Sequence, residues 1–265
     1  MYSRFEVIQK FIRYYFAASN GKGHGIHSPF VFDFVSNVLN DKRNFYAYLQ
    51  IEDIRSQLLK NEELIEEEDL GAGSSFSKTG KRPVSAIIRS ASKSEKFGRL
   101  LFRIANYYQP KTMVELGTSA GLSSAYLASA LPHSQLITIE GSPAIAGIAK
   151  KNFSALGLSN IELMTGNFDD ILPTVLGKHA TVDLTFIDGN HRKQPTLDYF
   201  NALIQHTAEN SLLIFDDIHW SDEMEETWEK IKNDERVMLT VDLFFLGIVF
   251  FKSDFKTKQH FIIRF

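Results

Sequence analysis

The feature that most constrains the fold is a regular alternation of helix-like and strand-like segments from residue 93 onward. Each strand-like segment is short and apolar on both faces, which is typical of a parallel sheet covered by helices on both sides. The expected strands are Thr112–Leu116, Gln135–Glu140, Ile161–Thr165, Val182–Ile187 and Leu212–Phe215. An apolar helix over about Glu95–Tyr108 precedes the first of them. The alternation predicts an α/β fold with a mostly parallel sheet.

The sequence ends with two further strand-like segments that are close together. They are Met238–Leu243 and Ile248–Lys252, joined by Phe244–Gly247. A parallel connection needs a crossover of a dozen or more residues, so this pair is expected to form an antiparallel hairpin.

The first 92 residues have a different pattern, which predicts helices and loops. A charged helix is expected over Glu52–Glu68, ending at Gly71 and Gly73, and a Gly- and Ser-rich mobile loop over Gly71–Pro83. We therefore expect a helical cap or substrate lid over residues 1–92 and a ligand-binding domain over residues 93–265. The aromatic first helix suits packing against its own protein better than a membrane surface.

Composition narrows the class of partner. A net charge of −3 and a pI near 6.3 give no basic surface for nucleic acid. With no cysteine, disulfides and thiolate chemistry are excluded. No secretory leader and no apolar run of about 20 residues is evident, so we expect a cytoplasmic protein without a membrane span. A homodimer is left open.

Two glycine turns resemble nucleotide-binding loops. Asp69–Ser74 fails on context, because an acidic segment precedes it and no apolar helix follows. The turn Gly117–Gly121 lies between an apolar strand and an apolar helix, where a helix N-terminus favours an anion. Its G-x-x-x-G spacing suits one carboxylate better than a pyrophosphate, although a plain βα turn is the alternative.

The next strand supplies an acid at its end. Glu140 follows Gly117 by 23 residues, near the offset of about 20 that places a carboxylate on ribose hydroxyls. After the third strand, Asn167 and Phe168 suit an adenine ring, with a plain turn as the alternative.

Together these motifs resemble the class I S-adenosylmethionine (SAM)-dependent methyltransferases, over about residues 98–251. The segments around Gly98, Phe186–His191 and Phe215–Asp217 are most similar to the catechol and caffeoyl-CoA O-methyltransferase group. The resemblance implies a Rossmann-like sheet and SAM as the methyl donor. The residues it assigns to SAM are Glu115, Gly117, Thr118, Ser119, Gly121, Ser123, Glu140, Gly141, Ser142, Asn167, Phe168 and Asp188.

Three carboxylates follow the fourth and fifth strands. In the cation-dependent relatives the matching positions bind a divalent metal through Asp, Asp and Asn. Here they are Asp188, Asp216 and Asp217, an oxygen set that suits Mg²⁺, Mn²⁺ or Ca²⁺. Alternatively, Asp188 orients the SAM amine, and Asp216 binds substrate or caps a helix.

His191 occupies the position of the catalytic lysine of those relatives. Imidazole titrates near neutral pH, so His191 is the candidate base, with Asp188 beside it; a surface turn histidine is the alternative. His219 and Trp220 either contact the acceptor or pack at a helix entry.

The sequence thus predicts methyl transfer from SAM to a small-molecule acceptor, with a hydroxyl oxygen favoured over nitrogen and a metal assisting in one version. The alternatives are an NAD-dependent oxidoreductase, aminopropyl transfer and a non-catalytic SAM-binding protein. The G-x-x-x-G spacing and the terminal hairpin disfavour the oxidoreductase.

Overall fold

The structure is a computed structural model that describes residues 1–66 and 81–265. The chain packs into two compact units, one of residues 1–41 and 179–265 and one of residues 42–178. We call them the split unit and the central unit.

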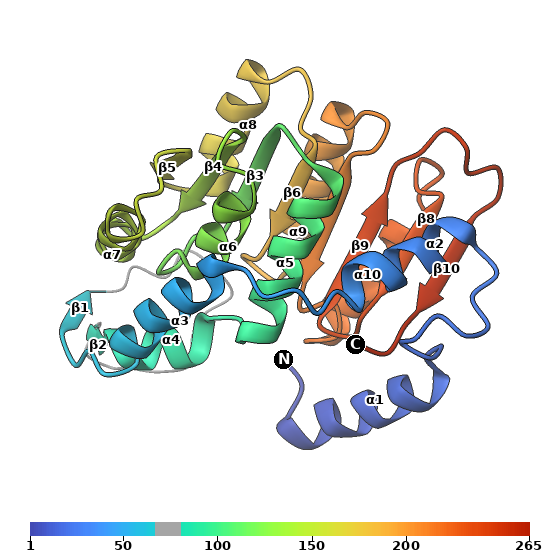
Figure 1. The fold of residues 1–265 in the computed structure, drawn as a ribbon, viewed down its shortest axis with the longest axis horizontal. Helices are drawn as coiled ribbons and strands as arrows, with labels where there is room; N and C mark the ends of the chain where they lie inside the picture. Colours follow the sequence, from blue (N-terminus) through green and yellow to red (C-terminus); the bar gives the residue numbers. More distant parts are fainter. Residues whose placement is uncertain (67–80) are drawn as a thin grey trace. The chain divides into compact units, whose positions relative to one another are not determined.

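The central unit contains a parallel three-stranded sheet with helices around it (Figure 1). In that sheet β4 lies between β3 and β5. A small antiparallel pair, β1 and β2, precedes it. The elements are α3 (Tyr46–Leu58), β1 (Leu64–Glu66), β2 (Lys81–Pro83), α4 (Val84–Ala91), α5 (Glu95–Tyr108), β3 (Thr112–Leu116), α6 (Leu122–Ala130), β4 (Gln135–Glu140), α7 (Pro143–Ala155), β5 (Ile161–Thr165) and α8 (Phe168–Lys178).

The core of the central unit lies between β3, β4 and the helices α5 and α6. Met113, Val114 and Leu116 of β3 are fully buried, as are Leu101 and Ile104 of α5. Burial on both faces explains why these strands have apolar residues at successive positions.

The split unit contains strands β6 to β10. β6 and β7 are parallel, β9 is antiparallel to both β7 and β8, and β10 is parallel to β8. The elements are α1 (Arg4–Ala17), α2 (Pro29–Phe34), the π-helical turn η1 (Val35–Leu39), β6 (Leu184–Ile187), α9 (Lys193–Leu203), the 3₁₀ turn η2 (Ile204–His206), β7 (Leu212–Asp216), α10 (Asp222–Asn233), β8 (Leu239–Asp242), β9 (Leu246–Phe250) and β10 (Gln259–Ile262).

Helix α1 packs on the turn between β8 and β9. Phe11 and Tyr14 contact the ring of Phe244, at centroid distances of 5.1 and 5.2 Å. The Tyr14 hydroxyl donates to the carbonyl of Ile263, and Lys10 forms a 2.9 Å ion pair with Glu225 of α10. One face of α1 is therefore held by its own unit.

The predicted α/β class and the mostly parallel sheet are confirmed, as are the expected strands to within two residues at each end. The terminal hairpin is also confirmed, by the pairing of β8 with β9.

One expectation about an element was wrong, and one strand was not predicted. The helix expected over Glu52–Glu68 is α3, which ends at Leu58, and residues 64–66 form β1. Asn61 explains the break, because its side-chain oxygen accepts the Glu63 N–H at 2.8 Å and forms a turn. Strand β10 was not expected at all.

The glycine-rich segments of the N-terminal region lie only partly within the described residues. Asp69–Ser74 and most of the loop predicted over Gly71–Pro83 lie outside the described residues, whereas Lys81–Pro83 form β2. The expected boundary at residue 92 falls inside the central unit, and the lid role of residues 1–92 stays a prediction. Among the described helices, none has the length and apolar character required to cross a bilayer.

Candidate active site

The glycine turn after β3 meets the end of β4. Gly117 has φ +100°, a conformation that L side chains rarely adopt, and its N–H donates to the Ile139 carbonyl at 3.0 Å. The Ser119 N–H then donates to Glu140 Oε2 at 2.8 Å. The two parts of the motif that the sequence placed on one ligand therefore touch within the central unit.

The Glu140 carboxylate is fixed from both sides. Its other oxygen accepts the Ser142 N–H at 2.9 Å, while the Ser142 hydroxyl caps α7 by accepting from Ile145 N–H. Ser142 is itself buried, so its side chain serves the helix. Gly141 lies between these two residues. Glu140 is half-buried, which leaves a side chain of fixed orientation at the carboxyl end of β4.

Glu115 lies beneath the turn in a buried polar network. Its side chain is fully buried, and its Oε2 accepts from the Thr138 hydroxyl at 2.6 Å and from the Ser124 hydroxyl. The Thr118 hydroxyl lies 2.6 Å from that of Thr138, and since the Thr138 proton goes to Glu115, Thr118 donates. Glu115 and Thr118, expected around a ligand, thus connect β3, β4 and α6.

The first turn of α6 has the features of an anion site. Gly121 is its N-cap and offers no side-chain cap to the first amides, unlike Ser142 of α7. The Ser119 hydroxyl is buried and has no hydrogen-bond partner among the described residues. Ser123 is half-buried in the same turn. Gly121 itself is tight against α7, because a Cβ there would lie 2.4 Å from the Phe153 ring.

The residues expected at adenine have a local structural role as well. The Asn167 side-chain oxygen accepts the Asp169 N–H at 3.1 Å at the start of α8. Asn167 is exposed and Phe168 is half-buried. Asn167 therefore forms the turn that was named as the alternative to adenine binding.

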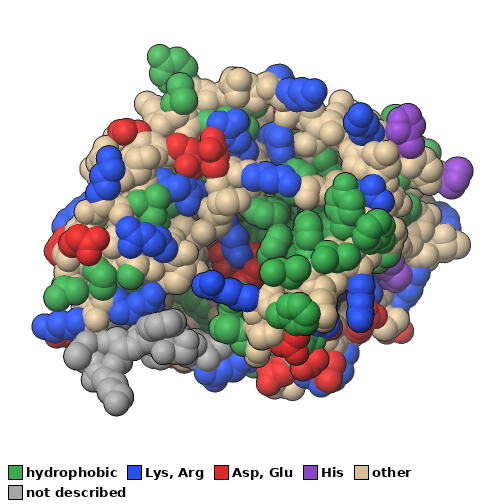
Figure 2. Space-filling view, turned by 90° about the horizontal axis from the view of Figure 1, so that it is seen from below, with side chains coloured by type: hydrophobic (Ala, Val, Ile, Leu, Met, Phe, Trp, Pro, Cys, Tyr) green, Lys and Arg blue, Asp and Glu red, His purple; other side chains and the backbone are tan. Residues whose placement is uncertain are grey.

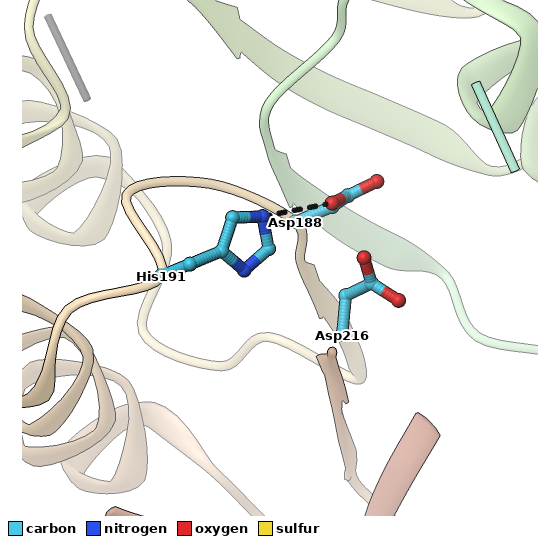
Figure 3. A group of neighbouring side chains, drawn as sticks. All are labelled: Asp188, His191 and Asp216. Atoms are coloured by element: carbon cyan, nitrogen blue, oxygen red, sulfur yellow. Dashed lines mark ion pairs between the residues drawn. The ribbon is translucent and has the colours of Figure 1, made fainter. Parts of the chain in front are cut away.

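A second group of polar side chains lies at the carboxyl ends of β6 and β7 in the split unit. One ligand-type atom from each of Asp188, His191 and Asp216 lies within 4.8 Å of the others. His191 Nε2 is 3.5 Å from Asp188 Oδ1, the ion pair dashed in Figure 3. Asp216 is only 1% exposed. These are two carboxylates and an imidazole, a set that can move a proton or hold a cation.

Backbone strain accompanies this group. Asn190 and His191 have φ of +68° and +39°, and Asp217 has +52°. Such conformations are uncommon for residues other than glycine and are concentrated at functional sites. Ser119, at φ +49°, follows β3 in the same way. Non-glycine residues with a strained, left-handed backbone therefore follow three of the strands, β3, β6 and β7.

Asp217 is not a member of the group with Asp188 and Asp216, although the sequence placed it there. Its N–H donates to the Phe245 carbonyl at 2.7 Å. His191 takes the third place instead. Among the described residues, the set expected for a metal is therefore brought together only in part.

His219 is largely buried and packs among side chains of its own unit. It lies between two carboxylates, with Nδ1 3.0 Å from Glu225 and Nε2 2.9 Å from Asp242, and it stacks on Phe244. Burial alone lowers the pKa of His219, but the hydrogen bonds and charges of Asp242 and Glu225 outweigh it, so the net shift is upward. Trp220 is partly exposed beside it.

Sequence reasoning missed the supporting residues of the site. Thr138 and Ser124 hold Glu115, and Asn190 donates from its side chain to the Tyr199 hydroxyl at 3.2 Å. A signal was available for Thr138, because a polar residue inside a buried apolar strand needs a hydrogen-bond partner.

Comparison with known proteins agrees with this geometry. Residues 114–218 match the sequence family described as a methyltransferase domain. A catechol O-methyltransferase of Niastella koreensis is 36% identical over 124 residues, 46% of this chain and 55% of that protein. A catechol O-methyltransferase of Mycobacterium tuberculosis is 29% identical over 127 residues, 47% and 56%. The chain thus spans about half the length of the curated relatives it matches.

Solved structures show the same fold. The O-methyltransferase TomG of Streptomyces achromogenes, in complex with SAM, has a TM-score of 0.58 at 19% identity, covering 80% of this chain and 92% of that one. An O-methyltransferase of Bacillus cereus, in complex with SAH, has a TM-score of 0.56 at 20% identity, covering 83% and 96%. Residues 114–218 are therefore similar to a methyltransferase domain, and the chain has the fold of solved O-methyltransferases.

Proposed function

We propose that this protein transfers the methyl group of SAM to a hydroxyl oxygen of a small molecule. The observation that carries the proposal is the 2.8 Å hydrogen bond from Ser119 N–H to Glu140, which joins the glycine turn to the acid. The catechol O-methyltransferase relatives support the reaction. The complexes of TomG with SAM and of the Bacillus cereus enzyme with SAH support the donor.

We assign donor binding to the central unit. The uncapped first amides of α6, with Ser119 and Ser123, suit the carboxylate of the methionine part. Glu140 suits the ribose hydroxyls, because it is a carboxylate of fixed orientation at a strand end. The remaining positions of the central unit that we assign to SAM are Glu115, Gly117, Thr118, Gly121, Gly141, Ser142, Asn167 and Phe168.

We assign acceptor activation to His191 and Asp188. The His191 imidazole accepts the proton of the acceptor hydroxyl while the oxygen lone pair forms the new bond to the methyl carbon. The bond from that carbon to sulfur breaks, its electron pair stays on sulfur, and S-adenosylhomocysteine is the second product. Asp188, 3.5 Å from His191, orients the imidazole and stabilises its charged form.

A divalent cation fits the same group. Asp188 and Asp216 offer oxygens, and His191 completes a mixed oxygen and nitrogen set within 4.8 Å. The two carboxylates suit Mg²⁺, Ca²⁺ or Mn²⁺, and Mn²⁺ serves as the probe ion. Such a cation supplies a lower pKa for a bound acceptor hydroxyl. His191 then has two candidate roles, base or ligand, and the two roles predict different results.

The experiment combines transfer of tritiated methyl from SAM to catechol, as the probe acceptor, with calorimetric titration of Mn²⁺. As a base, His191 is needed for turnover only: His191→Gln lowers kcat by roughly 10²–10⁴-fold and leaves Mn²⁺ affinity unchanged. If His191 is instead a metal ligand, His191→Gln lowers both kcat and the affinity for Mn²⁺. Asp216→Asn weakens Mn²⁺ binding in either case. The control is His133→Gln, a change at an exposed histidine outside this group.

A protein that binds neither SAM nor Mn²⁺ would contradict both assignments. SAM binding without transfer to any hydroxyl acceptor would favour the non-catalytic alternative.

A further inference from the structure

Helix α1 leaves a continuous apolar face in solvent. Its inner face packs on Phe244 through Tyr14 and Val7. On the outer face Phe5 is 68% exposed, Ile8 56%, Ile12 49% and Tyr15 47%. We call these four residues the α1 stripe. Figure 2, viewed from the side on which α1 lies, shows hydrophobic side chains gathered right of centre.

The α1 stripe has the spacing of a helix–helix seam. Its members follow one another at intervals of three, four and three residues, the a and d positions of a heptad. A helix that only lies on its own domain needs one such face, and α1 already has that face on Phe244. The heptad pattern thus points to a second helix as the occupant.

The order of residues in the stripe reads the same in both directions, as aromatic, isoleucine, isoleucine, aromatic. When two such helices pack antiparallel, Phe5 lies opposite the partner's Tyr15 and Ile8 opposite the partner's Ile12. A twofold interface needs this kind of self-complementary surface. We propose that a second copy of this chain covers the α1 stripe, with its α1 packed antiparallel on this one.

The charges around the α1 stripe are of both signs, which suits a second copy of the chain. The Tyr2 hydroxyl donates to Asp222 and Glu225, which places the acidic start of α10 beside the N-terminal end of α1. Asp222 is exposed, and so is Glu6 on α1 itself. Because α1 also carries the exposed cations Arg4 and Arg13, the side chains around the stripe are of both signs, and a seam between two antiparallel copies leaves this mixed set at its rim.

The area and the rigidity of the face also suit a dimer. With Met1 and Phe16, at 76% and 77% exposed, the stripe presents apolar surface on the order of 700 Å². A standard interface buries about 800 Å² per partner. The Ser3–Glu6 capping box and the ion pair of Lys10 with Glu225 form α1 before association, so little ordering cost remains.

The test is the oligomeric state by sedimentation velocity and light scattering. The wild-type chain is expected to be a dimer at micromolar concentration. Ile8→Glu places two carboxylates in the seam and is expected to raise the dimer dissociation constant at least about 100-fold. The matched control is Leu49→Glu on α3, which introduces the same side chain at a residue that is 74% exposed outside the stripe and leaves the dimer intact.

Cysteine crosslinking tests the direction of packing, since the chain contains no cysteine of its own. A mixture of Ile8→Cys and Ile12→Cys chains is expected to form a disulfide between the two variants faster than either variant alone. Rapid crosslinking of Ile8→Cys with itself would indicate parallel packing and overturn the antiparallel arrangement. A wild-type monomer, a dimer unchanged by Ile8→Glu, or flotation of the wild type with phosphatidylcholine–phosphatidylglycerol vesicles would overturn the proposal.

Discussion

At the scale of single residues, the buried Glu115 carboxylate depends on its hydroxyl donors. Replacing Thr138 with Val keeps the shape of the side chain and removes the donor that lies 2.6 Å from Glu115. We expect Thr138→Val to lower the free energy of unfolding by about 1–3 kcal/mol, because a buried charged acceptor loses a hydrogen bond. Urea denaturation followed by circular dichroism measures the change.

Thr174→Val on the exposed face of α8 is the control for that substitution, and an effect within about 0.5 kcal/mol is expected. Equal effects of the two changes would mean that the Glu115 network contributes nothing.

His219 links stability to pH. Its folded pKa is raised above the ordinary value of 6.5. Its contribution is therefore complete below pH 6.5 and is lost as the pH rises through the raised pKa. We expect the stability gap between wild type and His219→Gln to be largest near pH 6 and to shrink toward pH 9, in urea denaturation at several pH values. His133→Gln is the control, and a gap that does not vary with pH would show that His219 is uncharged.

The sequence predicted which strand ends bring site residues together, but it predicted less well which side chains then meet. Spacing along βα units predicted that Glu140 approaches the Gly117 turn, since strand ends of one parallel sheet share an edge. It did not predict that His191 rather than Asp217 joins Asp188 and Asp216. That outcome depends on the left-handed backbone of Asn190, His191 and Asp217, a conformation that is enriched in these residue types but not required by them.

At the scale of elements, the crossing of α5 and α6 depends on a glycine. A Cβ at Gly98 would lie 2.3 Å from the Tyr126 ring. We expect Gly98→Ala to destabilise the protein by about 1–3 kcal/mol, because overpacking moves α5 or the ring. Gly147→Ala in α7 is the matched control, since nothing lies within 4 Å, and it is expected to stabilise by about 0.5–1 kcal/mol. Denaturant unfolding measures both, and similar signs would contradict this account.

The elements that sequence reasoning found are those with a strong apolar pattern. β3, β4 and β7 are buried on both faces, so each is mostly apolar, although Glu115 interrupts β3 and Thr138 interrupts β4. β10 alternates between half-buried and exposed residues and contains Gln259 and His260, so it carries no such pattern. The end of α3 at Leu58 was missed because charge content was taken as helical, whereas the side chain of Asn61 ends the pattern.

At the scale of the whole molecule, a ligand that binds only the folded chain stabilises it by mass action. We expect SAM at 100 times its dissociation constant to add about 2.7 kcal/mol to the free energy of unfolding. NAD is expected to add nothing, because the turn lacks the glycine spacing for a pyrophosphate. Thermal unfolding with each ligand measures this, and stabilisation by NAD alone would favour the oxidoreductase alternative.

A pair of variants assigns that stabilisation to the proposed site. Glu140→Ala is expected to abolish most of the SAM effect, whereas Glu162→Ala, at an exposed position of β5, leaves it intact. Full stabilisation of the Glu140→Ala protein by SAM would place the donor elsewhere.

The double engagement of Glu140 limits how this protein can evolve. The carboxylate accepts hydrogen bonds from the amides of Ser119 and Ser142, and it is also the group proposed to bind the ribose hydroxyls. A substitution that favours a ligand with a phosphorylated ribose, such as Glu140→Arg, would remove the hydrogen bonds to both amides. The protein would lose these bonds before it gained a preference for the new ligand. Lineages that changed specificity at this position would first need stabilising substitutions elsewhere, so descendants are expected to diversify through the acceptor instead of the donor.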